Sequence, residues 1–234
     1  METLFKDLAN KIEVELNEKN ISDFLKYKNL LIETNKYMNL TSIVEDKEVI
    51  LKHFIDSLTI NKYVKNNSSI IDVGTGAGFP GIPLKIIRSD IEVTLLDSLN
   101  KRLKFLNEVI DELQLNNIQT KHGRAEDVAH DGLFREKFDY ATARAVANLS
   151  TLAEFCLPFV KIGGEFICMK GPLIEELGEA KKAISILGGE IISVNNFVLP
   201  DSDIERNIIV IKKIKSTPNK YPRKAGTPAK EPIK

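Results

Sequence analysis

Hydrophobic positions in the first 66 residues recur every three to four residues, the period of helices that bury one face. One such stripe is formed by Leu4, Phe5, Leu8, Ile12 and Leu16, and a second by Phe24, Leu25, Leu30 and Leu31. The polar residues 39–41 form a turn, and a third helix is predicted from about Asp46, a plausible N-cap. We therefore expect residues 1–66 to form a helical cap on a larger domain.

From Ser69 onward, short apolar runs alternate with helical stretches. The predicted strands are 69–73, 92–97, 118–122, 138–145, 164–170, 189–199 and 207–213, and the predicted helices start at about Phe79, Lys101, Asn148 and Leu173. Strands separated by helices indicate right-handed crossovers and a parallel sheet. The polar stretch between the last two strands is too short for a helix, so these two should form an antiparallel hairpin. The predicted fold is a doubly wound α/β sheet that ends in a hairpin.

Composition excludes several classes of protein. The chain has 234 residues, of which 43% are hydrophobic, so it can bury a core. It has no apolar run of the roughly 18 residues that span a membrane and no signal-peptide core. Its two cysteines, Cys156 and Cys168, and its three histidines lack the spacings of a disulfide framework or a zinc site. We expect a cytoplasmic protein that binds neither membrane nor metal.

The formal net charge is zero, with 33 basic and 33 acidic residues, but the charges are unevenly distributed. Residues 212–234 hold eight basic residues and one acidic residue, a balance of +7, so residues 1–211 carry −7. Four of the nine prolines lie in the same segment. From Ser216 we expect an extended or polyproline tail that binds an acidic polymer. A tail that only improves solubility is the alternative.

The strongest chemical signal is the segment DVGTGAGFPG at 72–81, after the first predicted strand. Glycines at every second position allow a sharp turn and a close approach of the backbone to a ligand. A tight turn without a ligand is the alternative. The next predicted strand ends at Asp97, where a carboxylate can accept both hydroxyls of an adenosine ribose. The combination predicts a cofactor that contains a nucleoside.

The glycine spacing, G-x-G-x-G, differs from the dinucleotide pattern G-x-G-x-x-G, which directs a helix N-terminus at a pyrophosphate. Asp72 would repel a pyrophosphate but would suit a ligand with an amino group and a sulfonium. S-adenosylmethionine therefore fits better than a nicotinamide dinucleotide. The terminal hairpin agrees, because in this respect the sheet resembles that of class I methyltransferases.

Seven segments carry a closer resemblance. They are NKYMNLTSI at 35–43, KHFIDSL at 52–58, DVGTGAGFPGIPL at 72–84, LLDSLNKRLKFL at 95–106, GRAED at 123–127, TARAVA at 142–147 and the tail at 217–234. In these segments, which follow one another along nearly the whole chain, the sequence resembles the bacterial ribosomal RNA small-subunit methyltransferase G family, also called glucose-inhibited division protein B.

The resemblance implies a class I S-adenosylmethionine-dependent methyltransferase fold, with a Rossmann-like, seven-stranded, mostly parallel sheet. The resemblance also implies methyl transfer to N7 of a guanine in 16S ribosomal RNA near the decoding site, leaving S-adenosylhomocysteine. From the patterns described above, we expect an N-terminal helical cap (1–66), a methyltransferase domain (67–215) and a basic tail (216–234) in one compact unit. Whether the substrate is naked RNA, an assembly intermediate or the whole small subunit stays open.

By motif match, the resemblance also implies the cofactor contacts. These are Gly74, Phe79, Asp97, Ser98, Leu99, Ala125, Glu126 and Arg144. Phe79 is equally a core residue at the start of a helix. Ala125 is small enough to leave space for adenine, and Glu126 or Asp127 can accept from its exocyclic amine. Ordinary loop residues are the alternative for these last three.

No catalytic residue is expected. The stretch that starts at Thr142 has neither the N/D-P-P-Y/F motif of amino-methylating enzymes nor a Pro-Cys nucleophile. Guanine N7 has a lone pair and no proton, so alignment with the methyl group is sufficient. We interpret Arg144 as a partner of the cofactor carboxylate or of an RNA phosphate. A structural ion pair with a carboxylate at the edge of the sheet is the alternative.

Further residues are predicted to contact RNA. They are His53, Lys170, Lys220, Tyr221, Arg223 and Lys224. For His53, which lies one helical turn from Asp56, the alternative is a packing role within the cap. For Lys170 it is an ordinary lysine at a strand end. The basic residues of the tail, with Tyr221 available to stack on a base, suit a single-stranded backbone.

Overall fold

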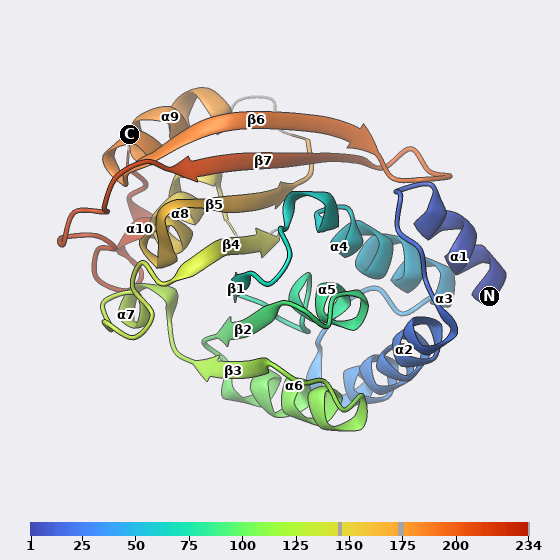
Figure 1. The fold of residues 1–234 in the computed structure, drawn as a ribbon. Coiled ribbons are helices and arrows are strands. Elements are labelled where there is room, and N and C mark those ends of the chain that lie inside the picture. Colours follow the sequence, from blue (N-terminus) through green and yellow to red (C-terminus); the bar gives the residue numbers. More distant parts are fainter. Residues whose placement is uncertain (145–146, 173–175, 234) are drawn as a thin grey trace.

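The structure, a computed structural model, describes residues 1–144, 147–172 and 176–233. Its strands are β1 (Ser69–Val73), β2 (Glu92–Asp97), β3 (Ile118–His122), β4 (Phe138–Arg144), β5 (Val160–Lys170), β6 (Gly189–Val198) and β7 (Glu205–Lys213). Across the described residues they form one sheet in the order β3-β2-β1-β4-β5-β7-β6 (Figure 1). The first five strands pair in parallel, and β7 is antiparallel to both β5 and β6. The predicted parallel sheet with a terminal hairpin is confirmed.

The N-terminal residues are helical, as predicted, with two differences in detail. The helices are α1 (Glu2–Asn10), α2 (Glu18–Met38), α3 (Asp46–Val49), the π-helical segment η1 (Ile50–Ile55), α4 (Asp56–Leu58) and the 3₁₀ turn η2 (Asn61–Tyr63). The first stripe does not continue as a helix to Leu16, because Glu13 adopts a left-handed conformation (φ 60°) and turns the chain. The N-cap of α3 is Glu45 and not Asp46, since the Glu45 carboxylate accepts from the Glu48 N–H at 2.9 Å.

Further helices lie between the strands, and one follows the last strand. They are α5 (Gly81–Ile87), α6 (Asn100–Glu112), α7 (Ala125–Val128), α8 (Leu149–Cys156), the 3₁₀ turn η3 (Leu157–Phe159), α9 (Glu176–Ile186) and α10 (Thr227–Lys230). Asn148 caps α8 by accepting from the Thr151 N–H at 2.9 Å, which confirms the predicted start. The predicted helix start at Leu173 and part of the segment 142–147 lie outside the described residues.

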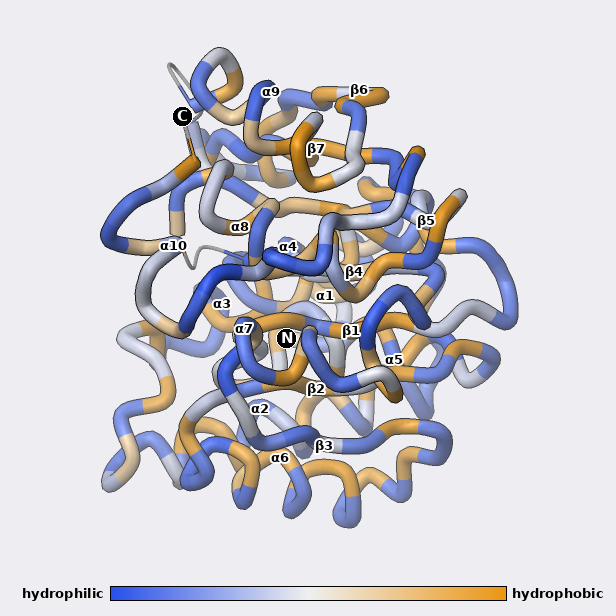
Figure 2. The backbone as a smooth tube through the Cα atoms, turned by 90° about the vertical axis from the view of Figure 1, so that its left-hand side faces the viewer, coloured by the Kyte–Doolittle hydropathy of each residue, from blue (hydrophilic) through white to orange (hydrophobic). Residues whose placement is uncertain are grey.

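Alternate residues of the strands enter two hydrophobic clusters, one on each face of the sheet. Ile70 and Val210 pack in the cluster that contains α1, α2, α5 and α6. Their neighbours Ile71 and Ile211 pack in the cluster that contains α8 and α9. Figure 1 shows the two helical layers on either side of the sheet, and Figure 2 shows hydrophobic and hydrophilic positions alternating along α6. The N-terminal helices therefore share a core with the sheet.

The C-terminal tail is folded, which contradicts the expectation of an extended or polyproline segment. Arg135 donates to the carbonyls of Thr217 at 2.8 Å and Tyr221 at 3.0 Å. Thr151 donates from its hydroxyl to the Pro228 carbonyl at 2.9 Å. Composition indicated an extended chain, but these contacts with residues about 80 positions away attach the tail to α8 and to the loop between α7 and β4. In the part of the chain that the structure describes, no helix is long and apolar enough to cross a bilayer.

Candidate functional site

The loop after β1 has the conformation that its glycines predicted. Gly74, Gly76 and Gly78 all have positive φ angles, of 71°, 62° and 103°. At Gly76 an added Cβ would meet nothing closer than 4.0 Å, so the backbone conformation alone requires glycine there. At Gly78 a Cβ would lie 2.7 Å from the Tyr27 hydroxyl, so the close packing of the loop on α2 requires glycine as well.

Asp72, at the end of β1, is a buried carboxylate with one free oxygen. Its Oδ2 accepts from the Thr75 hydroxyl at 2.7 Å and from the Gly81 N–H at 2.9 Å. Its Oδ1 has no hydrogen-bond partner among the described residues. Burial raises the pKa of Asp72 to about 6. An unpaired buried carboxylate beside the glycine loop fits a ligand that carries positive charge, as S-adenosylmethionine does.

Asp97 joins the ends of β1 and β2. Its Oδ2 accepts from the Gly76 N–H at 3.0 Å and its Oδ1 from the Leu99 N–H at 2.8 Å. Oδ2 also lies 3.4 Å from Arg102 Nη1, whereas Oδ1 has a second lone pair that can still accept a ribose hydroxyl. The geometry is therefore compatible with the predicted ribose contact and explains how the side chain is held in place.

Five of the predicted cofactor residues line one cavity at the carboxyl ends of β1, β2 and β3. This strand-end cavity measures about 290 Å³ and is lined by residues that include Gly74, Asp97, Ser98, Ala125 and Glu126. The nearby Leu99 side chain is exposed and is not among the lining residues. The cavity lies at the topological switch point, where β1 has β2 on one side and β4 on the other. Ligands of open α/β sheets bind at this position.

The strand-end cavity has further walls that the sequence did not indicate. Leu152 and Phe155 come from α8, and Gly226 and Ala229 come from the C-terminal tail. The Gly226 N–H donates to Glu126 at 2.8 Å, so one oxygen of this predicted adenine partner is already occupied. The sequence did not indicate Gly226 and Ala229, because the tail showed only its charge and its prolines.

Phe79 packs in the core and is absent from the strand-end cavity. Its ring stacks on the His53 ring, with centroids 4.5 Å apart and planes 14° apart. It also lies 5.5 Å from the Tyr27 ring. The structure therefore places Phe79 in the position of its alternative interpretation, the core residue at a helix start. Its contact with the cofactor stays a prediction.

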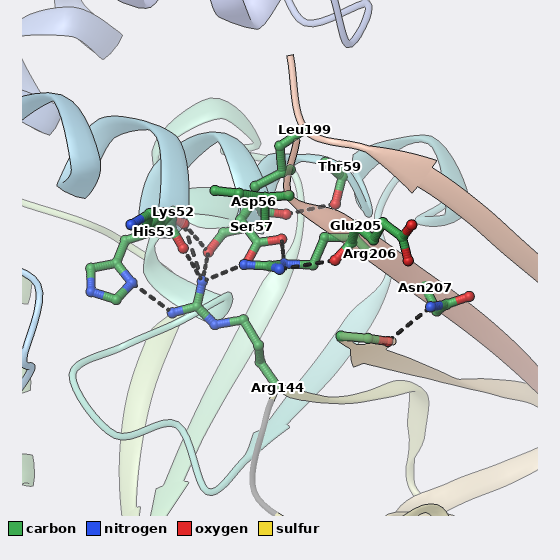
Figure 3. Close-up of polar contacts among 12 residues, drawn as sticks. Lys52, His53, Asp56, Ser57, Thr59, Arg144, Leu199, Glu205, Arg206 and Asn207 are labelled. Atoms are coloured by element: carbon green, nitrogen blue, oxygen red, sulfur yellow. Dashed lines mark hydrogen bonds and ion pairs between the residues drawn. The ribbon is translucent and has the colours of Figure 1, made fainter. Parts of the chain in front are cut away.

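Arg144, at the end of β4, forms a buried network with η1 and α4 (Figure 3). Its Nη1 lies 3.3 Å from Asp56 Oδ2 and donates to the Lys52 carbonyl at 3.2 Å. Arg206, from β7, donates to the other Asp56 oxygen at 3.0 Å. A structural ion pair was the alternative for Arg144, but the carboxylate that forms it comes from α4 and not from the edge of the sheet. The guanidinium is committed to Asp56, and a contact with the cofactor carboxylate or an RNA phosphate stays a prediction.

His53 is held in a defined tautomer. Arg144 Nη2 lies 3.1 Å from His53 Nδ1, and because a guanidinium only donates, Nδ1 accepts. The proton is therefore on Nε2, which is 2.8 Å from the Thr41 hydroxyl. Burial, reinforced by Arg144, lowers the pKa of His53 to about 3. His53 is neutral at physiological pH, so it has no charge to offer a phosphate.

A second cavity, the arginine cavity, measures about 330 Å³ and adjoins this network. Its lining includes Lys52, His53, Arg144, Lys170 and Arg206. The sequence had indicated three of these residues but not Lys52 or Arg206. Nothing in the sequence pairs Arg206 with Asp56, which lies 150 positions away in the chain.

Two other residues predicted to contact RNA form ion pairs within the protein, and a third is buried. Lys170 donates to the Ala147 carbonyl at 2.8 Å and pairs with Glu176 at 2.9 Å. Arg223 pairs with the buried Glu154, with Nη2 2.7 Å from Oε2. The Tyr221 side chain is buried, which contradicts the expectation that it is available to stack on a base. By contrast, Lys220 and Lys224 are exposed, as is Lys230.

The candidate site therefore consists of backbone groups held in position, carboxylates, and cations that are paired with acidic side chains. Within the described ranges, no cluster of three or more histidine, cysteine or acidic side chains is suited to a metal ion. Both cysteines are buried, and burial raises the pKa of the Cys168 thiol to about 12. Neither thiol is therefore an ionised nucleophile near neutral pH.

Solved structures share this architecture. An S-adenosylmethionine-dependent methyltransferase from Aquifex aeolicus aligns with a TM-score of 0.55 at 16% identity, over 74% of this chain and 96% of its own. M. jannaschii TYW2, in complex with AdoMet, aligns with a TM-score of 0.56 at 16% identity, over 74% of this chain and 80% of its own. These likenesses show the fold, which is that of the S-adenosylmethionine-dependent methyltransferases. The predicted fold class is confirmed.

Sequence comparison is more specific. The family model for rRNA small subunit methyltransferase G matches residues 20–209. The ribosomal RNA small subunit methyltransferase G of Alkaliphilus oremlandii is 55% identical over 100% of this chain and 99% of its own. That of Acetivibrio thermocellus is 56% identical over 96% of this chain and 93% of its own. The chain belongs to the rRNA small subunit methyltransferase G family, as its motifs predicted.

Proposed function

We propose that this protein transfers a methyl group from S-adenosylmethionine to N7 of a guanine in 16S ribosomal RNA, near the decoding site, in the cytoplasm. The observation that carries the proposal is the strand-end cavity, in which five motif residues of the family meet at the carboxyl ends of β1, β2 and β3. A metal ion has no part in the proposed reaction.

In this proposal, different residues at and near the strand-end cavity bind different parts of the cofactor. The backbone at Gly74 leaves space for the methionine part, and the free Oδ1 of Asp72 offsets its positive charge. Asp97 accepts from the ribose. Ala125 leaves space for the adenine, whose amine can donate to the oxygen of Glu126 that Gly226 does not occupy.

Bound there, the cofactor supplies an electrophilic methyl group. The chain need not provide a general base, because guanine N7 carries a lone pair and no proton. Alignment of two reactants can contribute about 7–11 kcal/mol. The methylated purine is cationic, so a free guanidinium beside it would be unfavourable. Asp56 offsets the charge of Arg144, and His53 is neutral. The arginine cavity thereby presents paired charges to the base.

The RNA is proposed to approach over the arginine cavity and the exposed lysines of the tail. N7 lies on the deep-groove edge of A-form RNA, which side chains reach poorly, so the target guanine must be unpaired. His53 and Lys170 line the cavity in which it would be held. Lys220, Lys224 and Lys230 are exposed and suit the flanking phosphates.

The proposal is tested by methylation of small-subunit RNA from a strain that lacks the enzyme. We expect label from S-adenosylmethionine to enter one guanine of the 16S RNA. We also expect the product strand to cleave there after reduction and aniline treatment, which is specific for N7-methylguanine. Offering naked RNA, an assembly intermediate and the whole subunit in parallel identifies the preferred substrate. Absence of label with all three, or label at a site that resists cleavage, would contradict the proposal.

Salt dependence tests the role of the tail lysines. Replacing Lys220, Lys224 and Lys230 with glutamine should flatten the slope of log affinity for RNA against log salt by about 2, because each phosphate contact to a single strand contributes about 0.7. A matched control replaces Lys26, Lys181 and Lys182, which are exposed lysines on α2 and α9. An equal change in slope in both variants would assign the effect to net charge and not to the tail.

A further inference from the structure

The C-terminal tail reaches the cavity that is proposed to bind the cofactor. Gly226 and Ala229, at the start and within α10, line the strand-end cavity together with Asp97 and Ala125. These two tail residues lie about 100 positions after Ala125 in the chain. The cavity is therefore assembled from the ends of the strands on one side and from the tail on the other.

An ion pair between the half-buried Arg223 and a buried carboxylate fixes the position of this part of the tail. Arg223 donates to Glu154 through Nε at 2.9 Å and through Nη2 at 2.7 Å, which is a two-pronged pairing with both carboxylate oxygens. The Arg223 N–H also donates to Glu154 at 2.7 Å. Glu154 is 0% exposed, so the loss of this partner would leave its hydrogen-bonding groups buried without Arg223. The pair therefore anchors the tail to α8 three residues before Gly226.

A second contact orients the tail at the cavity itself. The Gly226 N–H donates to Glu126 Oε1 at 2.8 Å, and Glu126 is a cavity residue. Gly226 adopts a φ of 86°, although an added Cβ would meet nothing within 4 Å. The glycine is thus required by the left-handed turn that starts α10. This turn brings Ala229 to the cavity, beside Leu152 and Phe155 of α8.

We infer that the tail is a wall of the cofactor site and contacts the adenosine end of the bound cofactor, with Arg223 as the positioning residue. This inference rests on the proposed function. It assigns to Arg223 a role in cofactor binding in place of the RNA contact expected from sequence. It places the adenosine end there because Asp97, Ser98 and Ala125, from the ends of β2 and β3, line the same cavity. The amino-acid end would then lie at Gly74, the residue of the glycine loop that lines the same cavity.

The experiment compares Ala229→Phe with Lys230→Phe in the full-length protein without RNA. Lys230 is adjacent in α10, is exposed and does not line the cavity, so it controls for the new side chain. Calorimetry measures the dissociation constants for S-adenosylmethionine and for 5′-methylthioadenosine, which lacks the amino-acid part. We expect Ala229→Phe to weaken both by about tenfold, and Lys230→Phe to leave both within about twofold.

The outcomes separate the inference from the proposed function. If the wild type does not bind S-adenosylmethionine, the proposed function fails. If the wild type binds and Ala229→Phe binds equally well, or loses affinity for S-adenosylmethionine alone, the inference is wrong. Arg223→Lys is a second variant, in case Ala229→Phe does not fold. We expect this substitution, which keeps the charge and loses the two-pronged geometry, to raise KM for S-adenosylmethionine by about threefold with kcat unchanged. An unchanged KM would overturn the positioning role.

Discussion

Replacing Asp56 with alanine is expected to lower the free energy of unfolding by about 3–5 kcal/mol, which is typical when one partner of a buried ion pair is removed. The Asp56 side chain is only 4% exposed and is shared by Arg144 and Arg206. Without it, two guanidinium groups in the protein interior lose their counter-charge. Urea unfolding of the protein at pH 7.5, with the midpoint and slope fitted together, measures the effect.

The matched control is Asp201→Ala, which removes the carboxylate of an exposed ion pair. Asp201 and its partner Lys11 are 57% and 49% exposed, so the loss should be less than about 1 kcal/mol. A similar small loss for Asp56→Ala would mean that water or a local shift compensates the two arginines. The buried network would then have little part in holding the N-terminal helices against β4 and β7.

Asp72→Asn is expected to change how stability depends on pH. Burial raises the pKa of Asp72 from 3.8 to about 6, so the folded protein keeps this proton to a higher pH than the unfolded chain. The contribution of protonated Asp72 to the free energy of unfolding is fully present below about pH 4 and is lost as the pH rises through 6. The shift of about two pH units corresponds to roughly 3 kcal/mol. Asparagine does not titrate, so between pH 4 and 8 the wild type should lose about 3 kcal/mol more than the variant.

Asp90→Asn is the control of opposite sign. A hydrogen-bonded pair with Arg88 lowers the pKa of Asp90, so this carboxylate stabilises the folded state above about pH 4 and loses that effect as the pH falls. The difference in stability between wild type and Asp90→Asn should therefore grow as the pH rises to about 5 and stay level above that pH. Parallel stability curves for wild type and Asp72→Asn over the same range would show that Asp72 does not titrate as expected.

Asp72→Asn should also weaken cofactor binding. If the positive charge of S-adenosylmethionine offsets the buried carboxylate, binding favours ionised Asp72, and affinity for the wild type should rise as the pH passes through about 6. Asp72→Asn should bind at least about tenfold more weakly at pH 8 and show a flatter pH profile. Calorimetric titration at several pH values measures both. The residue would then trade stability of the free protein for affinity.

The sheet was predictable because each strand was a short apolar run bounded by turn residues. Ile70 and Ile71 illustrate the principle, since consecutive residues point to opposite faces and both faces are covered. The π-helical segment η1 was not predictable, because its hydrophobic positions fit an ordinary helix equally well. It carries Lys52 and His53, whose carbonyls accept from Arg144.

The candidate site was predictable only where one short segment contains the chemistry. The glycine loop and Asp97 are local features, and they meet as expected. For Arg144, the sequence allowed either a contact with the cofactor or RNA or a structural ion pair. Only the fold identifies Asp56, which is distant in the chain, as the partner of Arg144. The prediction for the tail was wrong for the same reason. Its prolines and lysines indicate only local conformational preferences, whereas contacts with Glu154 and Arg135 determine its path.

The last strand of the sheet completes both hydrophobic layers at once. Val210 faces the layer built around the N-terminal helices, and Ile211 faces the layer of α8 and α9. As the chain leaves the ribosome, α1 and α2 are made first, yet β7, with which they share a core, is made about 170 residues later. Until β7 is made, each hydrophobic layer lacks the residues that this strand contributes. The protein should therefore acquire its native fold only after synthesis is nearly finished, and fragments that stop before β7 should be targets for chaperones and proteases.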